Sequence, residues 1–128
     1  MEDAVRILVA VCYVVIGVSH LVRPREWAEF FIRLREMGAV GGFVVAFVHF
    51  PLGAIIVAFH NVWTWPEVVL TICGWGLVVK GFLYFVSPAH AERMLKGVTL
   101  ERAWQFRLVS PFAFALSAFC IYLVLRRG

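Results

Sequence analysis

Charged residues are scarce in this chain: Asp, Glu, Lys and Arg make up 16% of its 128 residues, whereas hydrophobic residues make up 62%. Soluble domains carry charge on roughly a quarter of their residues, so this composition excludes a soluble globular domain. The sequence therefore predicts an all-α integral membrane protein. We expect one transmembrane domain over residues 1–128, folded as a four-helix bundle within the lipid bilayer.

Cysteine is almost absent, and no metal or catalytic motif is visible. Cys12, Cys73 and Cys120 fall in separate apolar segments without a CxxC spacing, which is typical of small packing residues. No HExxH sequence or carboxylate-rich helix suggests zinc or di-iron, and no nucleophile has an evident His–acid pair. His49 and His60 are about 16 Å apart along one helix, too far to be the two axial ligands of one haem. We expect no enzymatic activity, no metal and no cofactor.

The formal net charge of +4 does not indicate nucleic-acid binding. Eight of the twelve basic residues fall in two segments that flank apolar spans, without a basic helix or an RNA-binding aromatic motif. They are Arg23, Arg25, Arg33, Arg35, Arg93, Lys96, Arg102 and Arg107. By the positive-inside rule both segments are cytoplasmic, which predicts that both termini lie outside.

Four apolar runs are long enough to cross a bilayer, at about residues 4–22, 39–59, 66–86 and 108–125. Acidic residues precede the first span and no A-x-A cleavage site follows it, so we expect an uncleaved helix. Residues 24–37 and 88–106 connect the spans on the cytoplasmic side. Trp27, Phe30, Phe31 and Leu34 form an apolar stripe opposite charged residues, which predicts an interfacial amphipathic helix. The alternative is a partner-binding helix whose stripe faces a groove of another protein.

The first and third spans share a pattern that indicates an internal two-fold repeat. A shift of 64 residues superposes Pro24 on Pro88 and Gly17 on Gly81, and it also aligns two valine pairs. Both prolines lead from a span into an interfacial segment. Under this alignment Lys80 occupies the place of Ile16.

Small residues in the second and third spans predict close helix packing. In the second span, Gly42, Ala46 and Gly53 share one helical face with His49. In the third span the equivalent candidates are Gly76 and Gly81. We expect these faces to meet other helices, because small side chains let backbones approach.

Lys80 is an ionisable residue within a membrane span, which by default raises a functional hypothesis. Its span and the second span are antiparallel because a tight turn joins them, so Lys80 can approach His49 near the membrane midplane. Cys73 and Tyr84 share the face of Lys80 and complete a candidate intramembrane polar site. Two alternatives remain. In the first, Lys80 snorkels to the cytoplasmic headgroups or makes a structural hydrogen bond, and His49 is a structural, hydrogen-bonded residue; in the second, they form a binding or transport site.

The turn at residues 60–67 contains a second candidate site, on the external side. His60, Asn61 and Glu67 could form a binding site there. The alternative is that Trp63 and Trp65 anchor the turn at the interface while Glu67 stabilises the next helix N-terminus.

Lys80-Gly81 is followed by a proline, an interfacial segment and another span, and this order resembles the YjeT-like small bacterial inner-membrane proteins, a family of unknown function. The resemblance covers residues 73–125, with the first half similar to a diverged second copy. Lys80 stands where an acid is expected, and Leu108 to Pro111 replace a Gly-rich opening. The resemblance implies an inner-membrane location and a role beside a larger membrane complex.

The sequence leaves two functions open. The first is a module that oligomerises or serves as an accessory subunit of a larger membrane complex, with its partners in the lipid bilayer. The second is a minimal transporter, or a proton- or anion-conducting protein, that uses a His49–Lys80 site. The first function is favoured because no acidic residue lies within the interior of the spans and no chain of polar residues continues from Lys80.

Overall fold

The computed structural model describes residues 1–127, and every regular element in that range is helical. Four helices are long and apolar enough to cross a membrane. The prediction of an all-helical protein with four spans is confirmed. In chain order the elements are α1 (Glu2–Val22), α2 (Pro24–Glu36), α3 (Ala39–Phe59), α4 (Val68–Val86), α5 (Pro88–Lys96), the 3-10 helix η1 (Ala103–Leu108) and α6 (Val109–Arg127).

The helix boundaries differ from the predicted ones mainly before the last span. The connection predicted over residues 88–106 is divided, because α5 ends at Lys96 and η1 begins at Ala103. The 3-10 turns of η1 lead directly into α6, as such turns often do at helix N-termini. Together η1 and α6 form a helical run of 25 residues.

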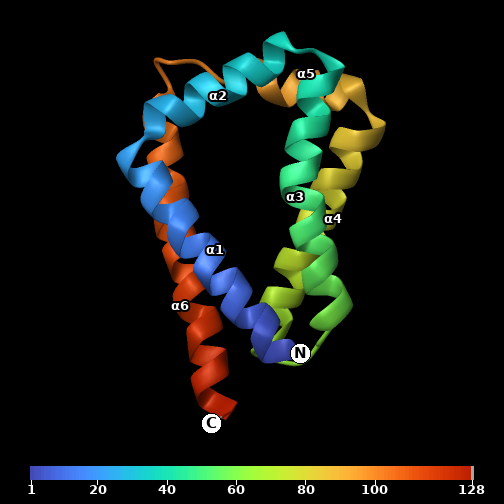
Figure 1. Ribbon diagram of the computed structural model, residues 1–128, viewed down its shortest axis with the longest axis vertical. Helices are drawn as coiled ribbons and strands as arrows, with labels where there is room; N and C mark the ends of the chain where they lie inside the picture. Colours follow the sequence, from blue (N-terminus) through green and yellow to red (C-terminus); the bar gives the residue numbers. More distant parts are fainter. Residues whose placement is uncertain (128) are drawn as a thin grey trace. The chain divides into compact units, whose positions relative to one another are not determined.

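The long helices form two antiparallel pairs, which belong to two compact units (Figure 1). In the first unit α1 lies beside α6, and in the second α3 lies beside α4. The first unit contains residues 1–29 and 99–127, and the second contains residues 30–98. The boundary therefore falls within α2. Each unit is described by itself below.

Two serine hydrogen bonds join α1 to α6 in the first unit. The buried Ser110 hydroxyl donates to the Gly17 carbonyl at 2.7 Å, and the buried Ser117 hydroxyl donates to the Ala10 carbonyl at 2.8 Å. Gly17 also faces Phe114, since a Cβ at Gly17 would lie 2.9 Å from the Phe114 ring. Between transmembrane helices such bonds are worth about 0.6 kcal/mol each on average. The pair is thus joined by both contact and hydrogen bonding.

Glycine contacts, not serine bonds, bring α3 and α4 together in the second unit. A Cβ at Gly53 would lie 2.7 Å from the Val78 nitrogen, and one at Gly81 would lie 2.5 Å from Phe50 Cβ. At the α5 end of this unit the apolar core consists of Leu34, Val45, Ala46, Tyr84, Ala91 and Leu95. The second unit therefore depends on close backbone approach along its spans.

The turn between α2 and α3 requires glycine at two positions. Gly38 has a φ of 66°, a left-handed conformation that side chains disfavour. Gly41 follows at the start of α3, where a Cβ would overlap the Leu34 carbonyl. The chain can therefore reverse from α2 into α3 only with both glycines present.

Candidate functional site

The structure brings together the two ionisable residues predicted for the intramembrane site. Lys80 Nζ of α4 lies 3.2 Å from His49 Nε2 of α3, within hydrogen-bond distance. His49 is ten residues from either end of α3, or about 15 Å by helical rise. The lysine is therefore held towards the middle of the helix pair.

The second nitrogen of the His49 ring fixes its role in this contact. His49 Nδ1 lies 2.7 Å from the Val45 carbonyl oxygen, which can only accept a hydrogen bond. Nδ1 therefore carries the proton, and Nε2 offers a lone pair to Lys80. His49 thus accepts one hydrogen bond from the lysine but supplies no negative charge to balance it.

Lys80 is exposed on the surface, and His49 is half-buried. The eight acidic residues of the chain all lie at or beyond the ends of the spans, so no carboxylate of the α3 or α4 interior faces the lysine. In a bilayer this surface faces hydrocarbon or another protein. An ammonium on a lipid-facing surface costs several kcal/mol, about 2.5–3.5 on insertion scales.

The other two members of the predicted polar site do not join the pair. Tyr84 is buried and packs its ring against that of His90, with the ring centroids 5.3 Å apart. Cys73 is half-buried. Within residues 1–127, no hydrogen bond links either side chain to His49 or Lys80. The polar site is therefore a pair, without the predicted track of four residues.

The external turn uses its polar groups to hold the chain together. His60 is fully buried, and its Nε2 donates to the backbone carbonyl of Glu67 at 3.1 Å. Asn61 Oδ1 accepts from Trp75 Nε1 at 3.4 Å. The side chains of His60, Asn61 and Glu67 do not converge on a common point through these bonds, and the buried His60 Nδ1 has no hydrogen-bond partner among the described residues.

Thr71 stabilises the same turn, and sequence reasoning missed it. Its buried hydroxyl accepts from the Val62 N–H at 3.0 Å and donates to the Val62 carbonyl at 2.7 Å. The sequence feature that could have indicated this role is a single hydroxyl residue in the first turn of an apolar span. Its partner lies nine residues earlier, where no local pattern connects the two.

We expect Thr71→Val to lower the free energy of unfolding by about 1–3 kcal/mol, because it leaves both Val62 polar groups without their partner. The matched control is Thr64→Val, since Thr64 is exposed in the same turn. Thermal unfolding in detergent measures both. Equal melting temperatures for the two variants would contradict the assigned role of Thr71.

Of the five predicted packing residues, four are packed against neighbouring residues and one is not. Gly53 and Gly81 lie at the α3/α4 contact, Ala46 is fully buried, and a Cβ at Gly42 would lie 2.9 Å from Ala91 Cβ. Gly76 has no atom within 4 Å of such a Cβ. Its assignment to a helix contact is wrong. Two residues away, on a different side of α4, Gly74 makes the contact with Ile56 that the prediction missed.

A second charged cluster lies where α1 begins and α6 ends. The side chain of Arg6 is fully buried and pairs with Asp3 at 2.8 Å and Glu2 at 3.3 Å. Glu2 also pairs with Arg127 at 2.7 Å. The Arg6 Nε has no hydrogen-bond partner among the described residues. These pairs join the two helix ends, a role that the sequence did not indicate.

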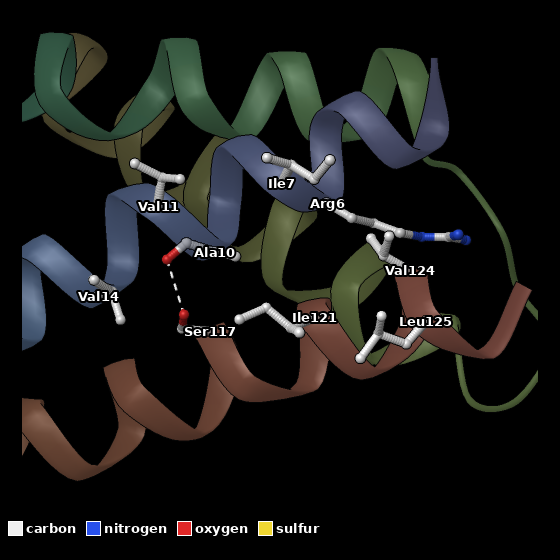
Figure 2. A pocket seen from close by; sticks show the side chains of 9 residues that line it. All are labelled: Arg6, Ile7, Ala10, Val11, Val14, Ser117, Ile121, Val124 and Leu125. Atoms are coloured by element: carbon white, nitrogen blue, oxygen red, sulfur yellow. Dashed lines mark hydrogen bonds between the residues drawn. The ribbon is translucent and has the colours of Figure 1, made fainter. Parts of the chain in front are cut away.

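A groove of about 320 Å³ runs along α1 and α6 beside this cluster (Figure 2). Aliphatic side chains line it almost completely, and the Ser117 hydroxyl is already bonded to Ala10. The groove therefore offers no group for chemistry. The aliphatic residues are Ile7, Val11, Val14, Ile121, Val124 and Leu125.

His20 is buried near the end of α1. Its ring stacks on Trp27, with the centroids 4.2 Å apart, and Nδ1 donates to the Ile16 carbonyl. Trp27 Nε1 donates in turn to Ser19 at 2.8 Å. One position before Trp27, Glu26 lies in the first turn of α2, where its own backbone N–H and the neighbouring Arg23 lower the pKa of its carboxyl.

Arg35 of α2 caps the C-terminal end of α5. Its Nη1 donates to the carbonyls of Val98 at 2.9 Å and of Leu95 and Lys96 at 3.4 Å each. The last carbonyls of a helix have no partner within the helix, and a cation there is favourable. Arg35 therefore ties together segments that are about 60 residues apart in the sequence.

We expect Arg35→Gln to lower the free energy of unfolding by about 0.3–1 kcal/mol and to expose the end of α5. Arg33→Gln is the control, because Arg33 is exposed and has no ion pair within residues 1–127. Hydrogen exchange at residues 95–98 reports the effect locally. Unchanged exchange there in the Arg35 variant would exclude the cap.

Comparison of the chain with protein-family models, with curated proteins and with solved structures finds no match. The resemblance to YjeT-like proteins therefore stays a prediction.

Proposed function

We propose that the protein is an accessory subunit of a larger membrane complex, and that its docking face is the surface of α3 and α4 around Lys80. The observation that supports this is an exposed lysine held near the middle of an apolar helix pair by His49, at 3.2 Å. A carboxylate from a span of another protein compensates the ammonium in a medium of low dielectric constant.

Charge complementarity favours a different protein over a second copy of this chain. A two-fold contact through this face brings Lys80 towards its own counterpart, and like charges at close range are unfavourable. A partner span that carries Asp or Glu near its middle satisfies the lysine. Gly42 and Gly53 already serve contacts within the unit, so the charge is the recognition element.

The topology of the proposal follows the positive-inside rule. Both connections rich in arginine lie in the cytoplasm, both termini lie outside, and α2 and α5 lie at the cytoplasmic interface of the inner membrane. Exposed Arg33 and Arg93 on these helices then meet lipid headgroups. Accessibility of single introduced cysteines to a membrane-impermeant reagent tests this orientation.

The test of the accessory role is gentle purification from the native membrane, followed by identification of any stoichiometric partner. The proposal expects a membrane protein with an acidic residue inside a span, and it expects Lys80→Met to release that protein. Purification of the chain alone or as a homo-oligomer only, from membranes that hold all its natural partners, would contradict the proposal.

A second function, conduction of protons or anions, is favoured by the hydrogen bond itself. The bond between Nζ and Nε2 joins two groups that can exchange a proton within the membrane. Proteoliposomes that contain only this protein distinguish the functions through pH-dependent flux. Flux that both Lys80→Met and His49→Ala abolish would replace the accessory role by transport.

A further inference from the structure

A sequence shift of 64 residues relates the helix contacts of the first unit to those of the second. In the first unit, a Cβ at Gly17 would lie 2.9 Å from the Phe114 ring. Adding 64 to Gly17 gives Gly81, and subtracting 64 from Phe114 gives Phe50. A Cβ at Gly81 would lie 2.5 Å from Phe50 Cβ. A glycine–phenylalanine contact thus occurs at corresponding positions in both helix pairs, through the ring of Phe114 in one and through the Cβ and backbone of Phe50 in the other.

A second contact obeys the same shift. Ser117 donates to the Ala10 carbonyl at 2.8 Å in the first unit. The shifted positions are Gly53 and Gly74, and a Cβ at Gly53 would lie 2.9 Å from the Gly74 carbonyl oxygen. The same carbonyl therefore faces the same partner position in each unit. In the first unit the serine hydroxyl donates a hydrogen bond to this carbonyl, and in the second unit the glycine lets the two backbones approach directly.

The buried positions also correspond. A shift of one residue rotates a helix face by about 100°, so agreement at one shift is sensitive to register. On α1 and α4, both members of four shifted pairs are buried, and on α6 and α3 both members of three pairs are buried. The pairs are Arg6/Leu70, Ala10/Gly74, Gly17/Gly81 and His20/Tyr84, and then Ser110/Ala46, Ser117/Gly53 and Cys120/Ile56.

We infer that the chain is two fused copies of a 64-residue, two-span element, and that each helix pair takes one helix from each copy. The first copy contributes α1 and α3, and the second contributes α4 and α6. Because α1 lies beside α6 and α3 beside α4, neither copy pairs its own two spans. Each copy therefore contributes one helix to each unit.

The duplication identifies the counterpart of the polar pair. His49 corresponds to Ala113, and Lys80 corresponds to Ile16. The α1/α6 pair thus contains the framework of the docking face without its charged group. If the proposed function holds, on which this step rests, the α1/α6 face has the same helix framework as the docking face and lacks its two ionisable side chains.

Cross-linking in the full chain tests the exchange of helices without reference to function. In a chain with Cys12, Cys73 and Cys120 replaced by alanine, paired cysteine substitutions at Gly17 and Phe114 should form an intramolecular link with a short thiol reagent. The pair at Gly81 and Phe50 should do the same. The control within the first unit is the pair at Val15 and Phe114, which should not link because Val15 faces about 200° away from Gly17 on α1. Failure of either glycine pair to link would overturn the inference.

Transplantation of the polar pair tests the equivalence of the two faces. We expect Ile16→Lys alone to lower the melting temperature, and addition of Ala113→His to restore most of the loss. The control is Val15→Lys with Ala113→His, because Val15 faces about 100° away and should show no such restoration. Ala113 is buried, so Ala113→Asn, which is smaller, serves as a second acceptor if the histidine is not tolerated.

A chain with Lys80→Met and His49→Ala, and with the transplanted pair, should regain the partner that the first two substitutions release. Retention of the partner by Lys80→Met would refute the proposed function and leave the cross-linking result standing. Release by Lys80→Met without recovery on transplantation would overturn the equivalence of the faces.

Discussion

Lys80→Met should release the partner from the purified complex and weaken its binding by about 150- to 5,000-fold. Removing one member of a buried charge pair costs about 3–5 kcal/mol, since the other charge stays without compensation. Methionine keeps the length and the apolar stem of lysine, so the helix surface changes little. The isolated variant should melt at a higher temperature than the wild type, because a charge without a carboxylate has been removed from an apolar surface.

The matched control for this result is Lys96→Met. It makes the same substitution at an exposed lysine at the end of α5, outside the spans. It should retain the partner at the wild-type ratio, as measured by quantitative mass spectrometry of the purified complex. If both variants retain the partner, Lys80 takes no part in docking.

Gly53→Ala and Gly81→Ala should each destabilise the α3/α4 unit by about 1–3 kcal/mol, the usual cost of overpacking. The added methyl group at Gly53 meets the backbone of α4, which cannot turn aside as a side chain can. At Gly81 it meets the Cβ and backbone of Phe50. Thermal unfolding in detergent measures the effect of each substitution.

Gly76→Ala is the control on the same helix. No atom lies within 4 Å of a Cβ at Gly76, and alanine is the better helix former by about 1 kcal/mol. This variant should therefore be as stable as the wild type or more stable. Destabilisation at Gly76 equal to that at Gly53 would mean that loss of glycine, and not the helix contact, determines the result.

The spans themselves could be predicted from the sequence, because length and hydropathy determine which segments cross a bilayer. The approach of His49 to Lys80 could also be foreseen. The tight turn makes α3 and α4 antiparallel, and the depth of each residue follows from counting along its helix. The rotation of α4 about its own axis could not be foreseen. The sequence predicts a helix contact at Gly76, whereas the structure has that contact at Gly74. Two residues differ by about 200° on a helix.

The contacts between distant segments were beyond a single sequence. Nothing in the hydropathy of the spans indicates that α1 pairs with α6 and not with α3, since all four are similarly apolar. The cap that Arg35 places on α5 and the burial of Arg6 depend on such pairings. A charge near a span end is ordinarily assigned to the headgroups, which is why the sequence predicts Arg35 only as a cytoplasmic residue.

In the proposed function, Lys80 faces a carboxylate of another protein inside the membrane. Treatment of native membranes with a hydrophobic carbodiimide, followed by mass spectrometry, tests it directly, because the reagent joins an amine to a carboxylate only at contact distance. We expect an amide between Lys80 Nζ and an Asp or Glu in an apolar span of a different chain. A complex that purifies intact with Lys80 unlinked, or linked only to its own chain, would contradict it.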